Sequence, residues 1–203
     1  MREHKRVKGI KKQTDNRFVN MYELDVVHRS GKPSKYFMAS RADGDDSLKL
    51  NTEKTQPDAV MVYALADDKL VLERQFRYVI DDYMYELPAG LTEEGEDIYE
   101  AASREFFEET GMKFDPFRDH STTNPFFLSA GMSDECMSTV FGSAYGLPDS
   151  GNQEDTEDIT VVLADRDECR RILKEEQVSI EAAFLMLCYI NSDRSDPFGF
   201  LIK

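Results

Sequence analysis

Three glutamates in one short segment are the residues of this sequence best suited to chemistry. Glu105 stands three residues before Glu108 and four before Glu109, so a helix would bring all three onto one face. Carboxylates at that spacing repel one another, and a purely structural helix would place lysine or arginine among them. A divalent cation removes the conflict, and hard oxygen ligands suit Mg²⁺ or Mn²⁺. The spacing therefore predicts a metal site that can handle phosphates.

The glutamates belong to a longer pattern: glycine, five residues, glutamate, seven residues, then Arg-Glu-apolar-any-Glu-Glu-any-Gly-apolar. This segment resembles the Nudix box and matches all of its fixed positions. A solvated acidic helix is the usual explanation of a charge run, but it would not explain the arginine and glycines at matching offsets. The matching residues are Gly90, Glu96, Arg104, Glu105, Phe106, Glu108, Glu109, Gly111 and Met112.

Four other segments, together with a predicted N-terminal hairpin, resemble the ADP-ribose pyrophosphatase-like branch of the Nudix hydrolases. They are residues 74–77, 86–90, 129–135 and 154–159. The resemblance implies a Mg²⁺-dependent enzyme, with Mn²⁺ as a possible substitute. Its substrate would be ADP-ribose or a related nucleoside diphosphate sugar, split into a nucleoside monophosphate and a sugar phosphate.

The resemblance also implies a set of metal ligands. Glu105 and Glu109, one helical turn apart, are the expected direct ligands, and Glu108 would bind directly or through water. The backbone carbonyl of Ala89 would add a further hard oxygen. Arg104 has two readings that stay open, a catalytic one and a structural one in which it orients the glutamates.

The general base is expected outside the box, because in the resembling pyrophosphatases a glutamate on a late loop takes the proton from water. Glu154 and Glu157 occupy such a loop, just before a predicted strand at 159–164. Glu157 is preferred, because the run Glu-Asp-Ile at 157–159 aligns most naturally with the late loop of the resembling pyrophosphatases. Glu135 is a further candidate, for binding metal or substrate.

Arginine clamps phosphate through two hydrogen bonds, which lysine does not match. Arg74 and Arg77 share a predicted strand, where alternation would place them on opposite faces. Arg77, nearer the loop, is the expected substrate contact. Gly131 belongs to a Ser-Ala-Gly loop where ADP-ribose hydrolases tend to carry Ser-Pro-Gly. The absent proline weakens ADP-ribose as the sole substrate and leaves a GDP- or UDP-sugar open.

Two other functions compete with this one. Another Nudix substrate class, a dinucleoside polyphosphate or an oxidised nucleoside triphosphate, is disfavoured by the Glu-Leu-Pro-Ala-Gly run at 86–90 and by the hairpin. A non-catalytic ligand-sensing module would typically lose box glutamates, whereas this sequence keeps all four.

The composition of the chain bears on its binding partners and its location in the cell. The formal net charge is −15, from 25 basic and 40 acidic residues, which argues against nucleic acid as a partner. No apolar run approaches the length of a membrane span, and the basic N-terminus lacks the apolar stretch of a secretory signal. Cys136, Cys169 and Cys188 are scattered, as expected for reduced thiols in a cytoplasmic protein.

The predicted elements describe an α/β (α+β) fold. The resemblance implies a mixed β-sheet sandwiched between helices, preceded by an N-terminal antiparallel β extension. Residues 1–50 would form this extension and residues 51–203 the hydrolase domain. The extension is expected to pack across a two-fold axis, so a homodimer is predicted. Helix 180–190 is apolar on most faces and is expected to be well buried. The expected strands are 18–29, 35–41, 59–65, 69–77, 83–87, 124–129, 136–145 and 159–164, and the expected helices are 97–109, 166–175 and 180–190.

Overall fold

The structure is a computed structural model that describes residues 6–52, 55–118, 124–151, 153 and 157–201. The chain forms two compact units. The first, called the hairpin unit here, comprises Met1–Asp58 and Pro125–Met137. The second, called the sheet unit, comprises Ala59–Asn124 and Ser138–Lys203. Each is described by itself.

The hairpin unit contains a three-stranded antiparallel sheet with β2 in the middle. The predicted hairpin is confirmed as β2 and β3. The preceding strand, β1, was not predicted, because its lysine-rich sequence lacks a clear apolar alternation. A small core of Tyr22, Leu24, Met38 and Leu48 lies on one face. The strands are β1 (Val7–Lys12), β2 (Asn20–Val27) and β3 (Pro33–Ser40), followed by a 3₁₀ turn, η1 (Asp45–Ser47).

A larger sheet forms the second unit, with strand order β11-β5-β4-β10-β8. Strand β6 pairs with β5, and β7 pairs with β4. The short strand β9 (Phe126–Phe127) belongs to the hairpin unit, as do Cys136 and Met137, the two residues of β10 with which it pairs. It is shorter than the predicted strand 124–129. The other strands are β4 (Ala59–Ala66), β5 (Lys69–Arg77), β6 (Asp82–Glu86), β7 (Ala89–Leu91), β8 (Lys113–Pro116), β10 (Cys136–Tyr145) and β11 (Ile159–Ala164).

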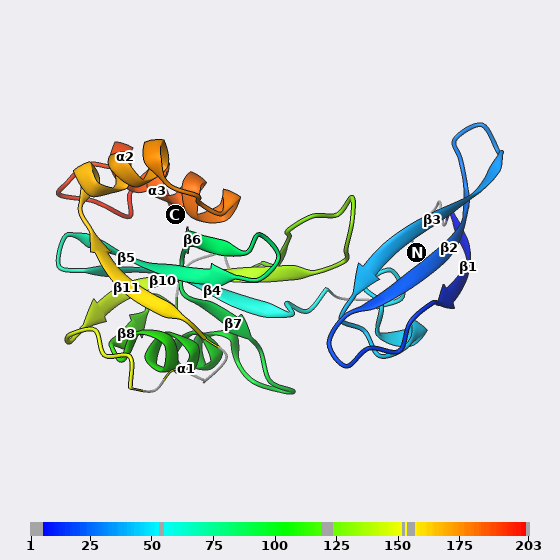
Figure 1. The fold of residues 1–203 in the computed structure, drawn as a ribbon, viewed down its shortest axis with the longest axis horizontal. Coiled ribbons are helices and arrows are strands. Elements are labelled where there is room, and N and C mark those ends of the chain that lie inside the picture. Colours follow the sequence, from blue (N-terminus) through cyan, green and yellow to red (C-terminus); the bar gives the residue numbers. More distant parts are fainter. Residues whose placement is uncertain (1–5, 53–54, 119–123, 152, 154–156, 202–203) are drawn as a thin grey trace. The chain divides into compact units, whose positions relative to one another are not determined.

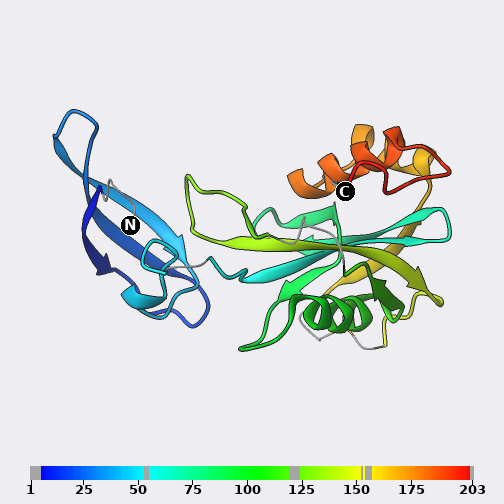
Figure 2. The same cartoon turned by 180° about the vertical axis from the view of Figure 1, so that it is seen from behind.

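Helices cover both faces of the larger sheet, as predicted. Figures 1 and 2 show α1 (Ile98–Thr110) on one face, and α2 (Arg166–Glu175) and α3 (Ile180–Asn191) on the other. The side chains of Asp97, Asp165 and Ser179 each accept a backbone N–H at a helix start, which satisfies groups that the helix itself cannot. The main core lies between α1 and the sheet and includes Val60, Val62, Val71, Ala101, Ala102, Phe106 and Val140.

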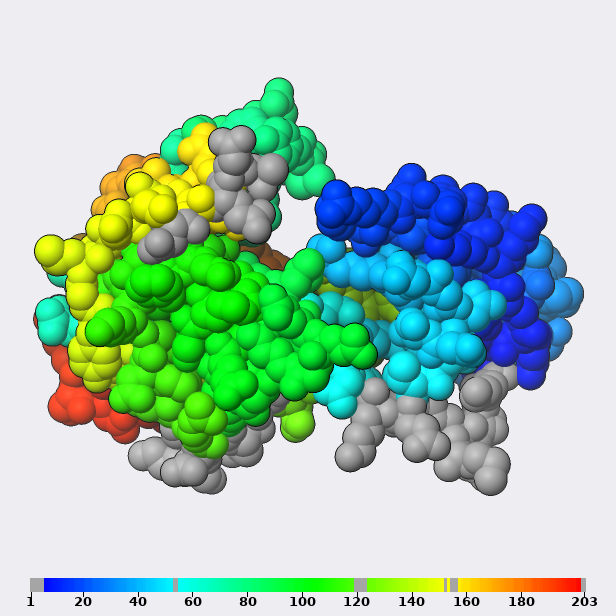
Figure 3. All heavy atoms as spheres, turned by 90° about the horizontal axis from the view of Figure 1, so that it is seen from below, coloured from blue at the N-terminus to red at the C-terminus, as the bar shows by residue number. Residues whose placement is uncertain are grey.

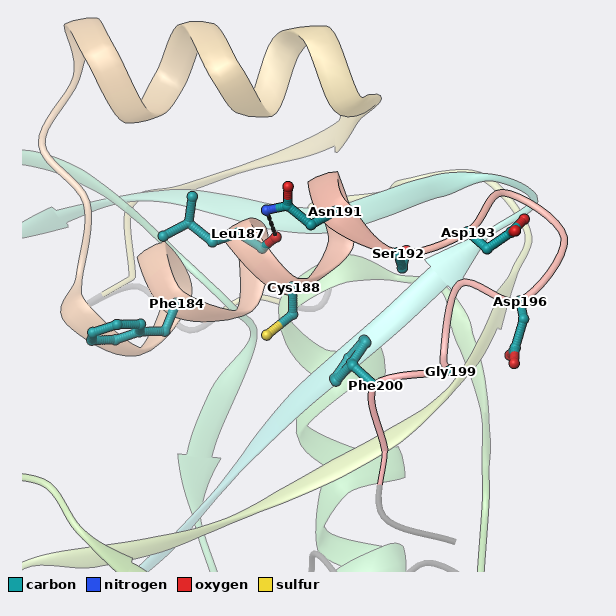
Figure 4. Close-up of a pocket in the computed structure, with 9 residues that line it drawn as sticks. All are labelled: Phe184, Leu187, Cys188, Asn191, Ser192, Asp193, Asp196, Gly199 and Phe200. Atoms are coloured by element: carbon teal, nitrogen blue, oxygen red, sulfur yellow. Dashed lines mark hydrogen bonds between the residues drawn. The ribbon is translucent and has the colours of Figure 1, made fainter.

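Helix α3 departs from the prediction that it is well buried. Ile180 and Phe184 are each 64% exposed, and Leu187 is 45% exposed. Only Ala182, Met186 and Tyr189 are fully buried, and the other apolar side chains of the helix are half-buried or exposed. Some of them border a pocket of about 690 Å³ against the C-terminal segment, shown in Figure 4. None of the described helices is long and apolar enough to span a membrane.

Helix α1 is capped at its C-terminal end by Gly111. This glycine has a φ of 68°, a left-handed conformation that costs other residues free energy. Its N–H donates to the carbonyl of Phe107, which closes the last turn. A Cβ atom there would also lie 2.5 Å from the backbone oxygen of Asp149. Both backbone conformation and space therefore require glycine at the end of the helix.

We expect Gly111→Ala to lower the free energy of unfolding by about 2 kcal/mol or more, since it combines left-handed strain with a backbone clash. Gly95→Ala is the matched control, because Gly95 has a φ of 79° but open space around it. The control should lose only about 1 kcal/mol. Urea unfolding measures both values, and equal losses would show that the Asp149 contact adds nothing.

Candidate active site

The carboxylates of α1 lie against the backbone of β7. Glu109 is only 4% exposed, and its Oε2 accepts the N–H of Ala89 at 3.0 Å. A Cβ atom on Gly90 would overlap the carboxylate of Glu105. A side chain at position 90 would therefore force the Glu105 carboxylate to move. Glu108, nearly half exposed, marks the outer edge of this group.

Arg104 holds three box carboxylates in place. Its guanidinium donates two hydrogen bonds to Glu96, at 3.0 and 2.9 Å. It also donates to Glu105 at 2.7 Å and to Glu108 at 3.2 Å. These bonds lower the pKa of Glu96 and raise that of Arg104. The contacts match the positioning role for this arginine.

A further carboxylate, Glu73 on β5, lies at the same place and was not predicted. It is 1% exposed. It sits directly across from Glu86 on β6, a position where side chains share one face of the sheet. Its Oε1 has no hydrogen-bond partner in the described part of the chain. The available sequence signal was a charged residue within the predicted strand 69–77.

The site carries an excess of buried negative charge. Burial raises the pKa of Glu109, and the neighbouring charges of Glu73 and Glu105 raise it further. Burial also raises the pKa of Glu73, with added repulsion from Glu86 and Glu157. The pKa of Glu105 rises for the same first reason, although Arg104 opposes it. A bound cation would relieve this repulsion.

A pocket of about 550 Å³ opens beside these carboxylates. Arg77, Glu86 and Glu157 line it, together with Gln75, Phe76, Tyr78, Val79 and Met84. The Nε of Arg77 donates to Glu86 at 2.6 Å. The guanidinium of Arg74 instead stacks on the ring of Tyr83 at 3.9 Å. The structure therefore brings Arg77, rather than Arg74, to the pocket. Figure 3 views the face of the sheet unit on which α1, in green, lies.

The remaining predicted residues do not join this group within the sheet unit. Glu135 and Gly131 belong to the hairpin unit. There Glu135 pairs with Arg41 at 2.7 Å, and the carbonyl of Gly131 accepts the hydroxyl of Tyr36. Glu154 lies outside the described residues.

The glutamates of this site are suitable ligands for a divalent cation, although several of them form hydrogen bonds with other groups in this structure. Among the described residues, no three His, Cys, Asp or Glu side chains converge as a ready-made metal site. Arg104 donates a hydrogen bond to Glu105, and the N–H of Ala89 donates one to Oε2 of Glu109. Yet the buried Oε1 of Glu73 has no hydrogen-bond partner within the described part of the chain, and carboxylates are the ligands that Mg²⁺ and Mn²⁺ prefer.

Comparisons with known proteins agree with this geometry. The NUDIX domain family model matches residues 55–184. The ADP-ribose pyrophosphatase of Bacillus subtilis (strain 168) is 26% identical over 146 residues, which cover 71% of this chain and 69% of that protein. The ADP compounds hydrolase NudE of Escherichia coli (strain K12) is 40% identical over 58 residues, covering 29% of this chain and 31% of that one.

A solved structure shows the same fold. The crystal structure of an ADP compounds hydrolase superposes with a TM-score of 0.64 and covers 89% of this chain and 90% of its own, at 19% sequence identity. The chain therefore belongs to the Nudix family of hydrolases and is similar to the ADP-ribose pyrophosphatases.

Proposed function

We propose that the protein is a divalent-metal-dependent hydrolase of ADP-ribose or a related nucleoside diphosphate sugar. The products would be a nucleoside monophosphate and a sugar phosphate. One observation carries the proposal: Glu109 accepts the N–H of Ala89, and Glu105 lies so close to Gly90 that a Cβ atom there would overlap its carboxylate. Such packing fixes two carboxylates beside a backbone that offers further oxygen ligands.

Each part of the site has a role in this proposal. Glu105, Glu109 and the carbonyl of Ala89 would hold Mg²⁺ or Mn²⁺, with Glu108 at the outer edge and Arg104 orienting the carboxylates. When bound, the cation would polarise the phosphate oxygens and make a water molecule more acidic. Arg77, which lines the pocket, would bind a phosphate of the substrate.

Glu157 is the proposed general base. Its carboxylate would take a proton from water as the water oxygen bonds to phosphorus and the bridging oxygen leaves with the other product. Two observations support this role: Glu157 lines the same pocket as Arg77, and its charge acts on both Glu105 and Glu109.

The substrate class rests on the relatives and on the pocket. The two curated relatives described above are named for ADP-ribose and for ADP compounds. The pocket combines an arginine with aromatic side chains, Phe76 and Tyr78, and such a surface can hold a phosphate beside a flat base. A screen of nucleoside diphosphate sugars, with products identified by mass, tests the assignment. Release of sugar phosphate from none of them would refute it.

Glu109→Gln should reduce kcat by about a hundredfold or more, since the loss of a major electrostatic stabiliser costs that much. The amide oxygen can still accept the Ala89 N–H, so the fold should persist. Glu100→Gln, an exposed carboxylate of the same helix, is the matched control and should keep wild-type turnover. Steady-state kinetics at saturating Mg²⁺ measure both, and a fully active Glu109→Gln enzyme would contradict the metal role.

Glu157→Gln should reduce kcat by roughly 10²–10⁴-fold, the usual contribution of a general base, while the KM changes little. Glu154→Gln should lose less. A larger loss in the Glu154 variant would reverse the order of the two residues. Near-wild-type activity in both would exclude a late-loop base and make Glu135 the leading candidate.

We further propose a homodimer in the cytoplasm, with the hairpin unit at the subunit interface. The sheet of this unit buries one face in its own small core but leaves several apolar side chains exposed. They are Phe18, Val19, Met21, Tyr36 and Phe37, exposed by 40 to 63%. A two-fold contact between copies would cover them, and the free thiols of Cys136, Cys169 and Cys188 suit a reducing compartment.

Phe37→Lys should convert the dimer to a monomer, because Phe37 is 56% exposed in the single chain and a charge there would have to be buried at the interface. Leu147→Lys, at an 83% exposed position of the sheet unit, is the matched control and should stay dimeric. Light scattering gives both masses. A monomeric wild-type protein with full activity would contradict the shared interface.

A further inference from the structure

Glu73 is a buried carboxylate that the Nudix box does not explain. It lies on β5, with Val161 of β11 on one side and Glu86 of β6 on the other. Val71, two residues earlier on the same face of β5, packs in the core that includes Ala101 and Phe106 of α1. The side chain of Glu73 therefore points to the α1 side of the sheet.

One oxygen of this carboxylate has no hydrogen bond in the described part of the chain. Arg77 donates to Glu86, and Arg104 is shared among Glu96, Glu105 and Glu108. At 1% exposure water does not solvate the group, and Oε1 has no partner among the described residues. Burying an uncompensated carboxylate disfavours its charged form, and a bound cation would favour that form again.

Glu73 shares its surroundings with the other carboxylates of the site. Burial and the charges of Glu86, Glu157 and Glu105 raise the pKa of Glu73, although Arg77 opposes them, and Glu73 in turn raises the pKa of Glu109. Glu73 thus lies among the carboxylates between helix α1 and the sheet. A single divalent cation there would serve several of these oxygens at once.

We propose that Glu73 is a further metal-binding residue of this site, whose carboxylate shares a divalent cation with Glu109. The inference rests on the proposed function, because it assigns one more ligand to the same metal centre. It differs from the box pattern in drawing on a strand of the sheet. The cation would then be held between the helix and the sheet rather than by the helix alone.

Mn²⁺ binding to the full-length protein, followed by the electron paramagnetic resonance signal of free Mn²⁺, tests the proposal without any turnover. Glu73→Gln should weaken Mn²⁺ binding by tenfold or more, within the range for residues that hold or orient a metal. Glu86→Gln is the matched control: it removes the same charge from the directly opposite position, where the carboxylate already has Arg77 as a partner. The control should weaken binding less than threefold.

Denaturant unfolding of the metal-free variants excludes a merely structural role. Glu73→Gln should be at least as stable as the wild type without metal, because a buried charge is removed. If the Gln variant does not fold, Glu73→Met carries the same test, since methionine has similar length and suits an apolar site.

The outcomes separate the two proposals. Unchanged Mn²⁺ affinity in Glu73→Gln, or an equal loss in Glu86→Gln, would overturn the role of Glu73. If Glu109→Gln abolishes binding in that case, the proposed function stands. A wild-type protein that binds no Mn²⁺ would overturn both.

Discussion

Repulsion among buried carboxylates is the constraint on which the rest of this structure depends. Glu105 and Glu109 lie on helix α1, and Glu73 lies buried on strand β5 of the sheet that α1 packs against. Like charges in a medium of low polarity repel strongly. Arg104 offsets this repulsion at Glu105, and the N–H of Ala89 offsets it at Glu109. A bound ligand of positive charge would offset this repulsion, and a divalent cation is the ligand that carboxylates favour.

The surrounding elements keep these groups together. The apolar side of α1 packs into the core through Ala101, Ala102 and Phe106, which fixes the height of the helix above the sheet. Gly90 lets β7 approach the carboxylates, and Gly111 ends the helix without displacing the segment at Asp149. The two glycines of the box thus serve packing, while Glu105 and Glu109 are the proposed metal ligands.

Much of this arrangement could be predicted from the sequence, because it depends on local patterns. The helix of the box, its capping residues and most strands follow from apolar periodicity and from Ser, Asp and Gly at element ends. Strand β1 was missed because lysines interrupt its pattern. The exposed face of α3 was missed because apolar content alone does not show which side finds a partner. Glu73 was missed because its importance comes from pairing across the sheet with Glu86, at a separation that no local spacing encodes.

The measurement that tests the central claim most directly is the free energy of unfolding as a function of Mg²⁺ concentration, at constant ionic strength. A cation that binds only the folded protein should raise this free energy with the logarithm of its concentration, by about 2.7 kcal/mol at a hundred times the dissociation constant. Glu109→Gln should flatten the dependence. A wild-type stability that stays constant up to high Mg²⁺ and Mn²⁺ concentrations would contradict the account, because no metal would then bind the folded protein and offset the repulsion among the buried carboxylates.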